Sequence, residues 1–151
     1  MTDAHFLAAE GAIVERLREQ CPEARAVSTA ADMQAIEQRQ QTTPALYVLY
    51  DGYEPEQAVG RGRVQRVTQR WLVVAAVRNV AAPHRGDAAR DAAGPLLTHT
   101  LEALQGWTPA RGYSPLRLQD APGAQWMAGF AYFPTAWTTE LTTRGGTTDA
   151  R

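Results

Sequence analysis

The sequence predicts a small α+β protein, a two-layer sandwich in which a mixed or antiparallel sheet of about four to five strands carries helices packed on one face. Three observations predict this class. An amphipathic helix opens the chain, a stretch that is apolar on both faces lies at 45–50, and a long alternating stretch covers 63–80. A second long helix and two further strands follow. This order of elements is typical of one sheet covered by helices.

The first helix is expected over 3–20, because apolar residues recur there at the spacing of one helix face. Asp3 can cap its free N–H groups, and Pro22 ends it because proline cannot continue the helical hydrogen bonds. A short strand is expected next. Thr29 and Asp32 then have the spacing of a capping box, which predicts a short second helix.

Two strands in the middle of the chain are expected to form a hairpin. The stretch 45–50 is apolar on both sides, as in a strand at the centre of a sheet, and Asp51-Gly52 is expected to end it. The stretch 63–80 is basic in its first half and apolar in its second, so one end is expected in water and the other in the core. The charged segment 53–62 between them is expected to project as a long hairpin tip.

The second long helix is expected over 87–105, with Asp87 as its cap and Gly106 as its stop. Gly94-Pro95 lies inside this range. Proline removes one helical hydrogen bond and crowds the preceding turn, so a kink or two abutting segments are expected there.

The remaining strands are expected at 115–119 and at 125–143, the latter broken at Pro134. No repeat and no long linker divides the chain. We therefore expect a single domain over 1–143. The polar segment 144–151 has nothing to bury and is expected to be a disordered tail.

The composition excludes several classes of protein. The chain has 151 residues, and its fifteen basic residues, all Arg, against sixteen acidic ones give a net charge of -1. The chain as a whole therefore has no electrostatic attraction to nucleic acid or anionic membrane. Cys21 stands alone, which excludes an intramolecular disulfide and a cysteine-based zinc site and fits a reducing compartment. Neither a signal peptide nor an apolar run of spanning length is present, so no membrane partner is expected.

No spacing of catalytic groups or phosphate-binding glycines known from enzymes occurs in the sequence. The candidates for a metal or acid–base cluster are His84, Asp87, Asp91 and His99, but His99 is rotated off the line of the two aspartates on the predicted helix. The simpler interpretation is a cap, a favourable helix charge and surface histidines. We expect no enzyme activity, no catalytic residues, no metal site and no cofactor.

A run of basic residues is the main candidate for a partner surface. Arg61, Arg63, Arg66 and Arg70 lie within ten residues, and Arg66 and Arg70 share one face of the predicted strand. They can simply protect a solvated strand end against edge pairing. Alternatively they form a basic patch for a protein partner or for passing DNA. Tyr53 and Trp71 flank the run, and together with the arginines they are expected to serve as anchors of an oligomer or partner interface.

The second half of the chain carries a pattern of its own. Its parts are Gly94-Pro95-Leu96-Leu97, then Ala103-Leu104-Gln105-Gly106-Trp107 with Pro109, and then Pro115-Leu116. Together with the opening helix and Pro44-Ala45-Leu46-Tyr47-Val48, these parts give the chain a layout that resembles that of tail terminator proteins of Mu-like, long-tailed bacteriophages. The resemblance covers nearly the whole chain, to about Thr143. Within it, Gly94, Pro95, Gly106 and Trp107 form the structural motif, and Trp107 is expected to fold back over the helix.

The resemblance implies a structural protein of the virion. Proteins of this family form a hexameric ring on the last ring of the tail tube, stop its polymerisation and present a surface for head-tail joining. The implied partners are other copies of the chain, the tail tube protein and a head-completion or neck protein, with DNA only passing through the lumen. The implied location is the head-proximal end of the tail, reached from the host cytoplasm. No catalytic residue carries over.

Two alternatives remain open at this point. A head-tail connector or other neck protein would share the ring and the lack of chemistry. A small nucleic-acid-binding module would use the run from Arg61 to Arg70 directly, and salt-dependent affinity for DNA would reveal it.

Overall fold

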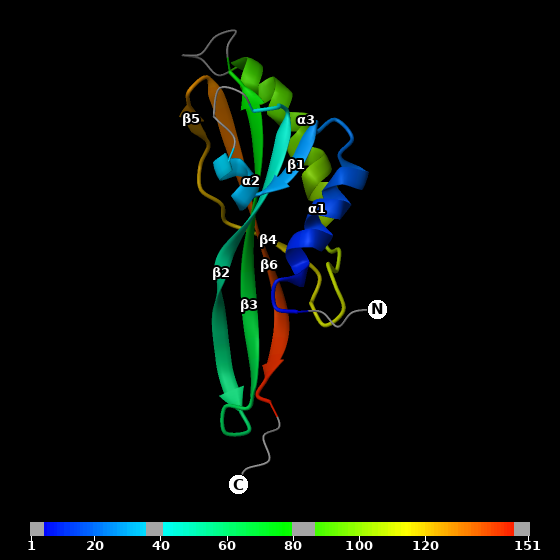
Figure 1. Cartoon of the computed structure of the whole chain (residues 1–151), viewed down its shortest axis with the longest axis vertical. Coiled ribbons are helices and arrows are strands. Elements are labelled where there is room, and N and C mark those ends of the chain that lie inside the picture. The colour runs from blue at the N-terminus through cyan, green and yellow to red at the C-terminus, as the bar shows by residue number, and fades with distance from the viewer. Residues whose placement is uncertain (1–4, 36–40, 80–86, 147–151) are drawn as a thin grey trace.

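The computed structural model of the chain describes residues 5–35, 41–79 and 87–146. Within these ranges it has three helices and six strands (Figure 1). In chain order they are α1 (Ala8–Gln20), β1 (Ala26–Thr29), α2 (Ala30–Ala35), β2 (Ala45–Val59), β3 (Val64–Arg78), α3 (Asp87–Leu104), β4 (Arg117–Gln119), β5 (Gln125–Met127) and β6 (Phe130–Arg144).

The strands form one open, mixed sheet in the order β1-β2-β3-β6-β4, with β5 also paired to β6. The strand β1 runs parallel to β2, and the other pairs are antiparallel. The predicted α+β class is confirmed. The sheet has six strands rather than four to five, because the stretch expected as one strand over 125–143 turns at 128–129 and divides into β5 and β6, which pair with each other.

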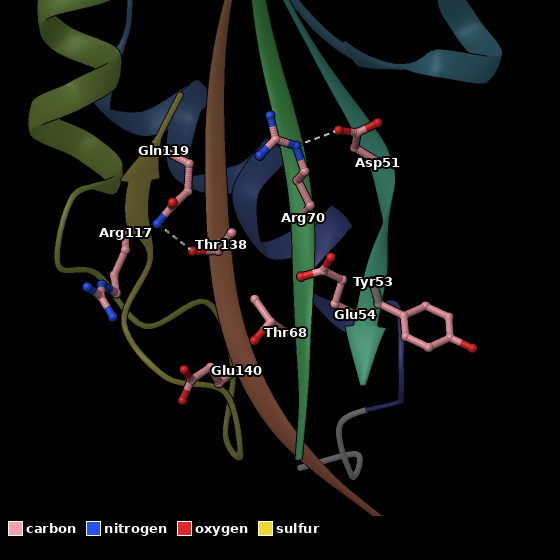
Figure 2. Close-up of a pocket in the computed structure, with 9 residues that line it drawn as sticks. All are labelled: Asp51, Tyr53, Glu54, Thr68, Arg70, Arg117, Gln119, Thr138 and Glu140. Carbon is pink, nitrogen blue, oxygen red and sulfur yellow. Dashed lines mark hydrogen bonds and ion pairs between the residues drawn. The ribbon is translucent and has the colours of Figure 1, made fainter. Parts of the chain in front are cut away.

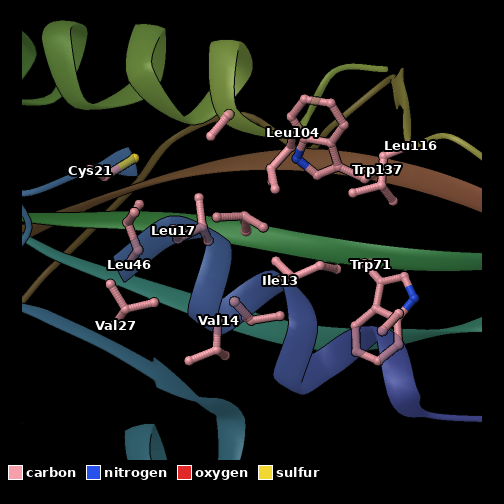
Figure 3. Packing of buried hydrophobic residues seen from close by; sticks show 14 of the residues in the cluster. Ile13, Val14, Leu17, Cys21, Val27, Leu46, Trp71, Leu104, Leu116 and Trp137 are labelled. Carbon is pink, nitrogen blue, oxygen red and sulfur yellow. The ribbon is translucent and has the colours of Figure 1, made fainter. Parts of the chain in front are cut away.

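The main core lies between the sheet and the two longer helices, α1 and α3, which pack on the same face and contact each other (Figure 3). Ile13 and Leu17 of α1 and Leu104 of α3 are fully buried against this face. Trp71 and Trp137, directly opposite each other on β3 and β6, fill the same layer. The amphipathic spacing of the two helices therefore did predict which side of each is buried.

The other face of the sheet carries a smaller cluster of buried residues, beside the segment in which β1 pairs with β2. Ala45, Tyr47 and Ala76 are buried there. The Tyr47 hydroxyl donates to Gln41 Oε1 at 3.1 Å, and Gln41 Nε2 donates to the Tyr132 hydroxyl at 2.7 Å. Both faces of this half of the sheet are thus occupied, as the apolar pattern of 45–50 indicated.

The strand β2 is much longer than expected. It continues past Asp51-Gly52, which form a bulge in the ladder instead of ending the strand, and a second irregularity follows at 55–58. Gly52 adopts a φ of +86°, a conformation that glycine reaches without steric cost. The predicted hairpin of β2 and β3 is confirmed, but the extent of its tip, 53–62, is wrong: only 60–63 turn, and 53–59 belong to β2.

Three other boundaries differ from the prediction. The helix α1 begins at Ala8, and Asp3 lies outside the described residues. The helix α3 continues without interruption through Pro95. Asp87 is its first helical residue rather than its cap, and it pairs with Arg90. Pro134 does not break β6, because it lies between the stretches of β6 that pair with β5 and with β4.

Two further predicted features are the start of α2 and the end of β6. One half of the predicted capping box is confirmed: the Asp32 carboxylate accepts a hydrogen bond from the backbone N–H of Thr29 at 3.3 Å. The Thr29 hydroxyl donates to the same carboxylate at 3.2 Å. The predicted disordered tail over 144–151 is wrong at its start, because β6 extends to Arg144 and the Gly145 N–H donates to the Arg63 carbonyl at 2.6 Å; residues 147–151 lie outside the described residues. Within the described ranges, no helix has the length and apolar character needed to cross a membrane.

Candidate functional site

The distal halves of β2, β3 and β6 extend beyond the helices as a three-stranded arm, which we define as residues 53–68 and 139–144 (Figure 1). In β2 every residue from Tyr53 to Val59 is exposed. The arm has little core of its own. It is held together by the uninterrupted ladder between β3 and β6 and by the pairing of β2 with β3, which has an irregularity at 55–58.

A shallow groove of about 580 Å³ crosses the face of the sheet that lies opposite the helices, at the base of the arm (Figure 2). Strand alternation places polar side chains there, since Arg70 lies beside the buried Trp71 in the sequence. Its lining is mixed in charge and comes from four strands: Asp51, Tyr53, Glu54, Thr68, Arg70, Arg117, Gln119, Thr138 and Glu140.

Rows of side chains run across this groove. Arg70 lies opposite Thr138, which lies opposite Arg117. In the next row, Thr68 lies between Glu54 and Glu140. The groove therefore presents three carboxylates and two guanidinium groups, with hydroxyls between them, to the solvent or to a partner.

Two of the predicted interface arginines have carboxylate partners within the chain. Arg70 Nε donates to Asp51 Oδ2 at 2.7 Å, and Arg70 Nη2 donates to the Asp120 carbonyl at 2.8 Å. Arg66 lies 3.8 Å from Glu140 and is more exposed. The two arginines share the face opposite the helices, as the alternation predicted.

The other two arginines of the run lie in the turn of the arm. Arg61 has a φ of +61°, in the left-handed region. Arg63 Nη2 donates to the Gly146 carbonyl at 3.1 Å, which attaches the end of β6 to the turn. The four arginines are therefore spread along the arm and its base and do not form one compact patch.

The two predicted aromatic anchors have different environments. Tyr53 is 56% exposed, and its ring meets that of Phe6 edge to face at 5.4 Å between centroids. Trp71 is completely buried in the main core, and its indole N–H donates to Gln69 Oε1 at 3.1 Å. The prediction that Trp71 is an interface anchor is therefore wrong, because strand alternation turns its side chain toward the helices.

The motif around the end of α3 has a structural role. Gly106 has a φ of +80°, which suits a residue that stops a helix, and its N–H donates to the Leu116 carbonyl at 2.9 Å. The Trp107 ring packs against the main core, and the Arg16 guanidinium lies 5.3 Å from its centroid. Gly94 and Pro95 are exposed on α3.

Replacing Trp107 by Ala should lower the free energy of unfolding by about 2 kcal/mol, less than a fully buried tryptophan costs, because the ring is only half-buried. Chemical denaturation of the variant beside the parent protein measures this. An unchanged midpoint and slope would show that the ring does not stabilise the fold.

The candidate metal cluster does not assemble from the described residues, in which no group of three or more His, Cys, Asp or Glu side chains could hold a metal ion. His84 lies outside those residues. His99 is instead paired with Glu23. The Glu23 carboxylate raises the pKa of His99. Partial burial raises the pKa of Glu23, but the hydrogen bond from His99, a backbone hydrogen bond and the charge of His99 together outweigh burial, and the net pKa of Glu23 is lowered.

This pair predicts a pH-dependent contact. The contribution of His99 is present below its unfolded pKa and is lost as the pH rises through its raised folded pKa; that of Glu23 is lost as the pH falls through its lowered folded pKa. The contact is therefore strongest between about pH 4.5 and 6.5. In an NMR titration, Glu23→Gln should lower the pKa of His99, whereas Glu19→Gln should leave it unchanged. Equal titration in all three proteins would contradict the pairing.

Several residues of the groove were not found by sequence reasoning. Asp51, Glu140 and Arg117 come from three strands that are far apart in the chain, and only the register brings them together. Gln69 was also missed. It is fully buried among the apolar side chains, where it accepts from Trp71 and donates to the Phe6 carbonyl.

Comparison with known proteins gives one clear result. The family model described as "Phage tail terminator protein" matches residues 2–148, which is nearly the whole chain. No curated protein matches the chain. The match covers the helical layer, the sheet and the arm alike. The chain therefore belongs to the phage tail terminator family and is a structural component of phage tail assembly.

Proposed function

We propose that this protein caps the phage tail tube, stops its polymerisation and provides the surface to which the head is joined. The observation that carries the proposal is the family match over 2–148. The protein acts as a homo-oligomeric ring, with six copies as the family resemblance implies. The ring sits at the head-proximal end of the tail in the virion, DNA passes through its lumen, and the reaction is assembly rather than catalysis.

The arm supports a role in assembly. An uncovered strand edge offers unpaired backbone groups, and proteins cover or protect such edges. Eleven residues of β2 past the end of β1 have no strand on their outer side among the described residues. We propose that the arm contributes to the oligomer or partner surface through Tyr53, Arg61, Arg63 and Arg66, together with Arg70 at its base.

The charge of the groove favours a protein partner over DNA for this surface. Arg66 and Arg70 each lie beside a carboxylate, Glu140 and Asp51, so the local field is not strongly positive. DNA binding without base contacts depends on neutralising phosphates with free basic groups. A mixed-charge groove is better suited to a protein surface of complementary pattern.

The direct test is capping in a purified system. Tail tube protein is allowed to polymerise with increasing amounts of this protein, and tube lengths are measured by electron microscopy. We expect the mean length to fall and an additional ring to appear at one end of the tubes. Tubes of unchanged length at a large excess of folded protein would contradict capping. Binding to isolated heads but not to tubes would instead identify a neck protein.

A further inference from the structure

The two edges of the arm sheet carry opposite charge. Beyond Val48, β1 no longer covers β2, and the outer edge of β2 is open among the described residues. We define the acidic edge as residues 50–59; it carries Asp51, Glu54 and Glu56 and has no basic residue. All three are exposed.

The opposite edge is formed by the segment that follows α3. It runs along β6, with Tyr113 opposite Leu141 and Arg117 opposite Thr138. We define the basic edge as residues 110–119; it carries Arg111 and Arg117 and has no acidic residue. Both arginines are exposed.

Most of these charges are not used inside the chain. Asp51 is paired with Arg70. Glu56 lies 3.5 Å from the Thr68 hydroxyl. Within the described part of the molecule, the structure gives no ion pair to Glu54, Glu56 or to the two arginines of the basic edge. These four groups are therefore available to a second molecule.

We propose that the acidic edge of one copy binds the basic edge of the next copy, in a head-to-tail contact that can close into a ring. The proposal rests on the proposed function, because it supplies the contact between the subunits of the terminator ring. A contact between two different patches is heterologous, and repetition of such a contact produces a ring when the rotation closes. A second copy supplies both patches at equal stoichiometry.

The topology is compatible with this contact. The strand β4 is antiparallel to β6, β6 to β3, and β3 to β2, so β4 and β2 run in opposite directions. Copies related by rotation about an axis along the strands would bring β4 and β2 together as antiparallel neighbours. The bulges and Pro55 interrupt a continuous backbone ladder, so the side-chain charges and the exposed ring of Tyr53 set the specificity.

The proposal is tested by two charge-reversal variants of the full chain. One carries Glu54→Arg and Glu56→Arg, which makes both edges basic. The other carries Arg111→Glu and Arg117→Glu, which makes both edges acidic. Neither should assemble with itself, since like charges would meet at every contact, and the concentration needed for assembly should rise by about tenfold or more. Asp51 is left unchanged because it holds Arg70.

Mixing the variants provides the decisive observation. In an alternating ring, every contact joins a basic edge to an acidic one, so the mixture should assemble, and co-expression should restore virions to a phage lacking the gene. The chain with all four changes should also assemble alone. Glu15→Arg with Glu19→Arg, on the exposed side of α1, is the matched control and should behave as the parent. Circular dichroism verifies that each variant is folded.

The outcomes separate the two proposals. If folded variants assemble and support virions as the parent does, or if the mixture restores neither assembly nor virions, the edge contact is wrong while tube capping still stands. If the parent itself fails to cap tubes and the gene is dispensable for tail length, the proposed function is wrong. Restoration only in the mixture and in the four-change chain supports the edge contact.

Discussion

Replacing Trp71 by Ala is expected to lower the free energy of unfolding by about 3–5 kcal/mol, the range found for large aromatic side chains removed from a core. Trp71 is completely buried, and its ring lies 5.3 Å from that of Tyr50 between centroids. Its loss would leave a cavity under α1 and would also remove the hydrogen-bond donor to the buried Gln69. A domain of this size is marginally stable, so much of the protein should unfold on moderate heating.

Trp126 provides the matched control. It is 43% exposed, and its ring contacts Phe133 at 5.8 Å between centroids. Trp126→Ala should therefore cost about 1 kcal/mol, the contribution of an aromatic pair plus a part-buried surface. Urea denaturation of both variants measures the difference. Equal losses of stability would contradict the assignment of Trp71 to the core.

Changing Arg66 and Arg70 together to Glu is expected to abolish normal virions while leaving the fold largely intact. Each new carboxylate would face an existing one, Glu140 or Asp51, and surface ion pairs are worth about 0–1 kcal/mol each. The stability cost is thus small, but the groove would lose one of its two guanidinium groups, and this face of the sheet would gain two carboxylates. Images of infected cells should show overlong tails, or tails of normal length without heads.

The corresponding Lys variant separates charge from geometry. Lysine keeps the positive charge but cannot form the forked hydrogen bonds of Arg70 with Asp51 and Asp120. Loss of virions with both variants would indicate that the arginine geometry is needed for a protein contact, whereas loss with Glu alone would indicate a need for charge only. Normal virions at normal yield from the folded Glu variant would contradict a role for this face.

Much of the fold could be predicted because the pattern of each element is local. The apolar stripe of α1 and the alternation along β3 identified the faces that the structure buries. The extent of β2 could not be predicted, because the carboxylates, Gly52 and Pro55 are typical of a loop. They remain in a strand because β3 provides pairing partners along most of the arm. Tertiary pairing outweighed local preference there.

The candidate site was less accessible to sequence reasoning. The basic run was visible, but whether each arginine is free or paired depends on residues up to 83 positions away, such as Gly146 beside Arg63. Trp71 was misassigned because its position next to the basic run suggested a shared surface, although alternate residues of a strand point to opposite faces. Counting the alternation from Arg70 would have placed the ring in the core.

Whether this protein caps the tail tube is best decided by the length of tails made without it. A phage with an early stop codon in the gene is grown in its host, and tails are measured by electron microscopy in lysates with and without the protein supplied from a plasmid. If this protein caps the tube and joins the head, tails made without it should have variable, excessive length and carry no heads, and the plasmid should restore a single length and joined heads. Tails of uniform, normal length joined to heads in the absence of the protein would contradict it.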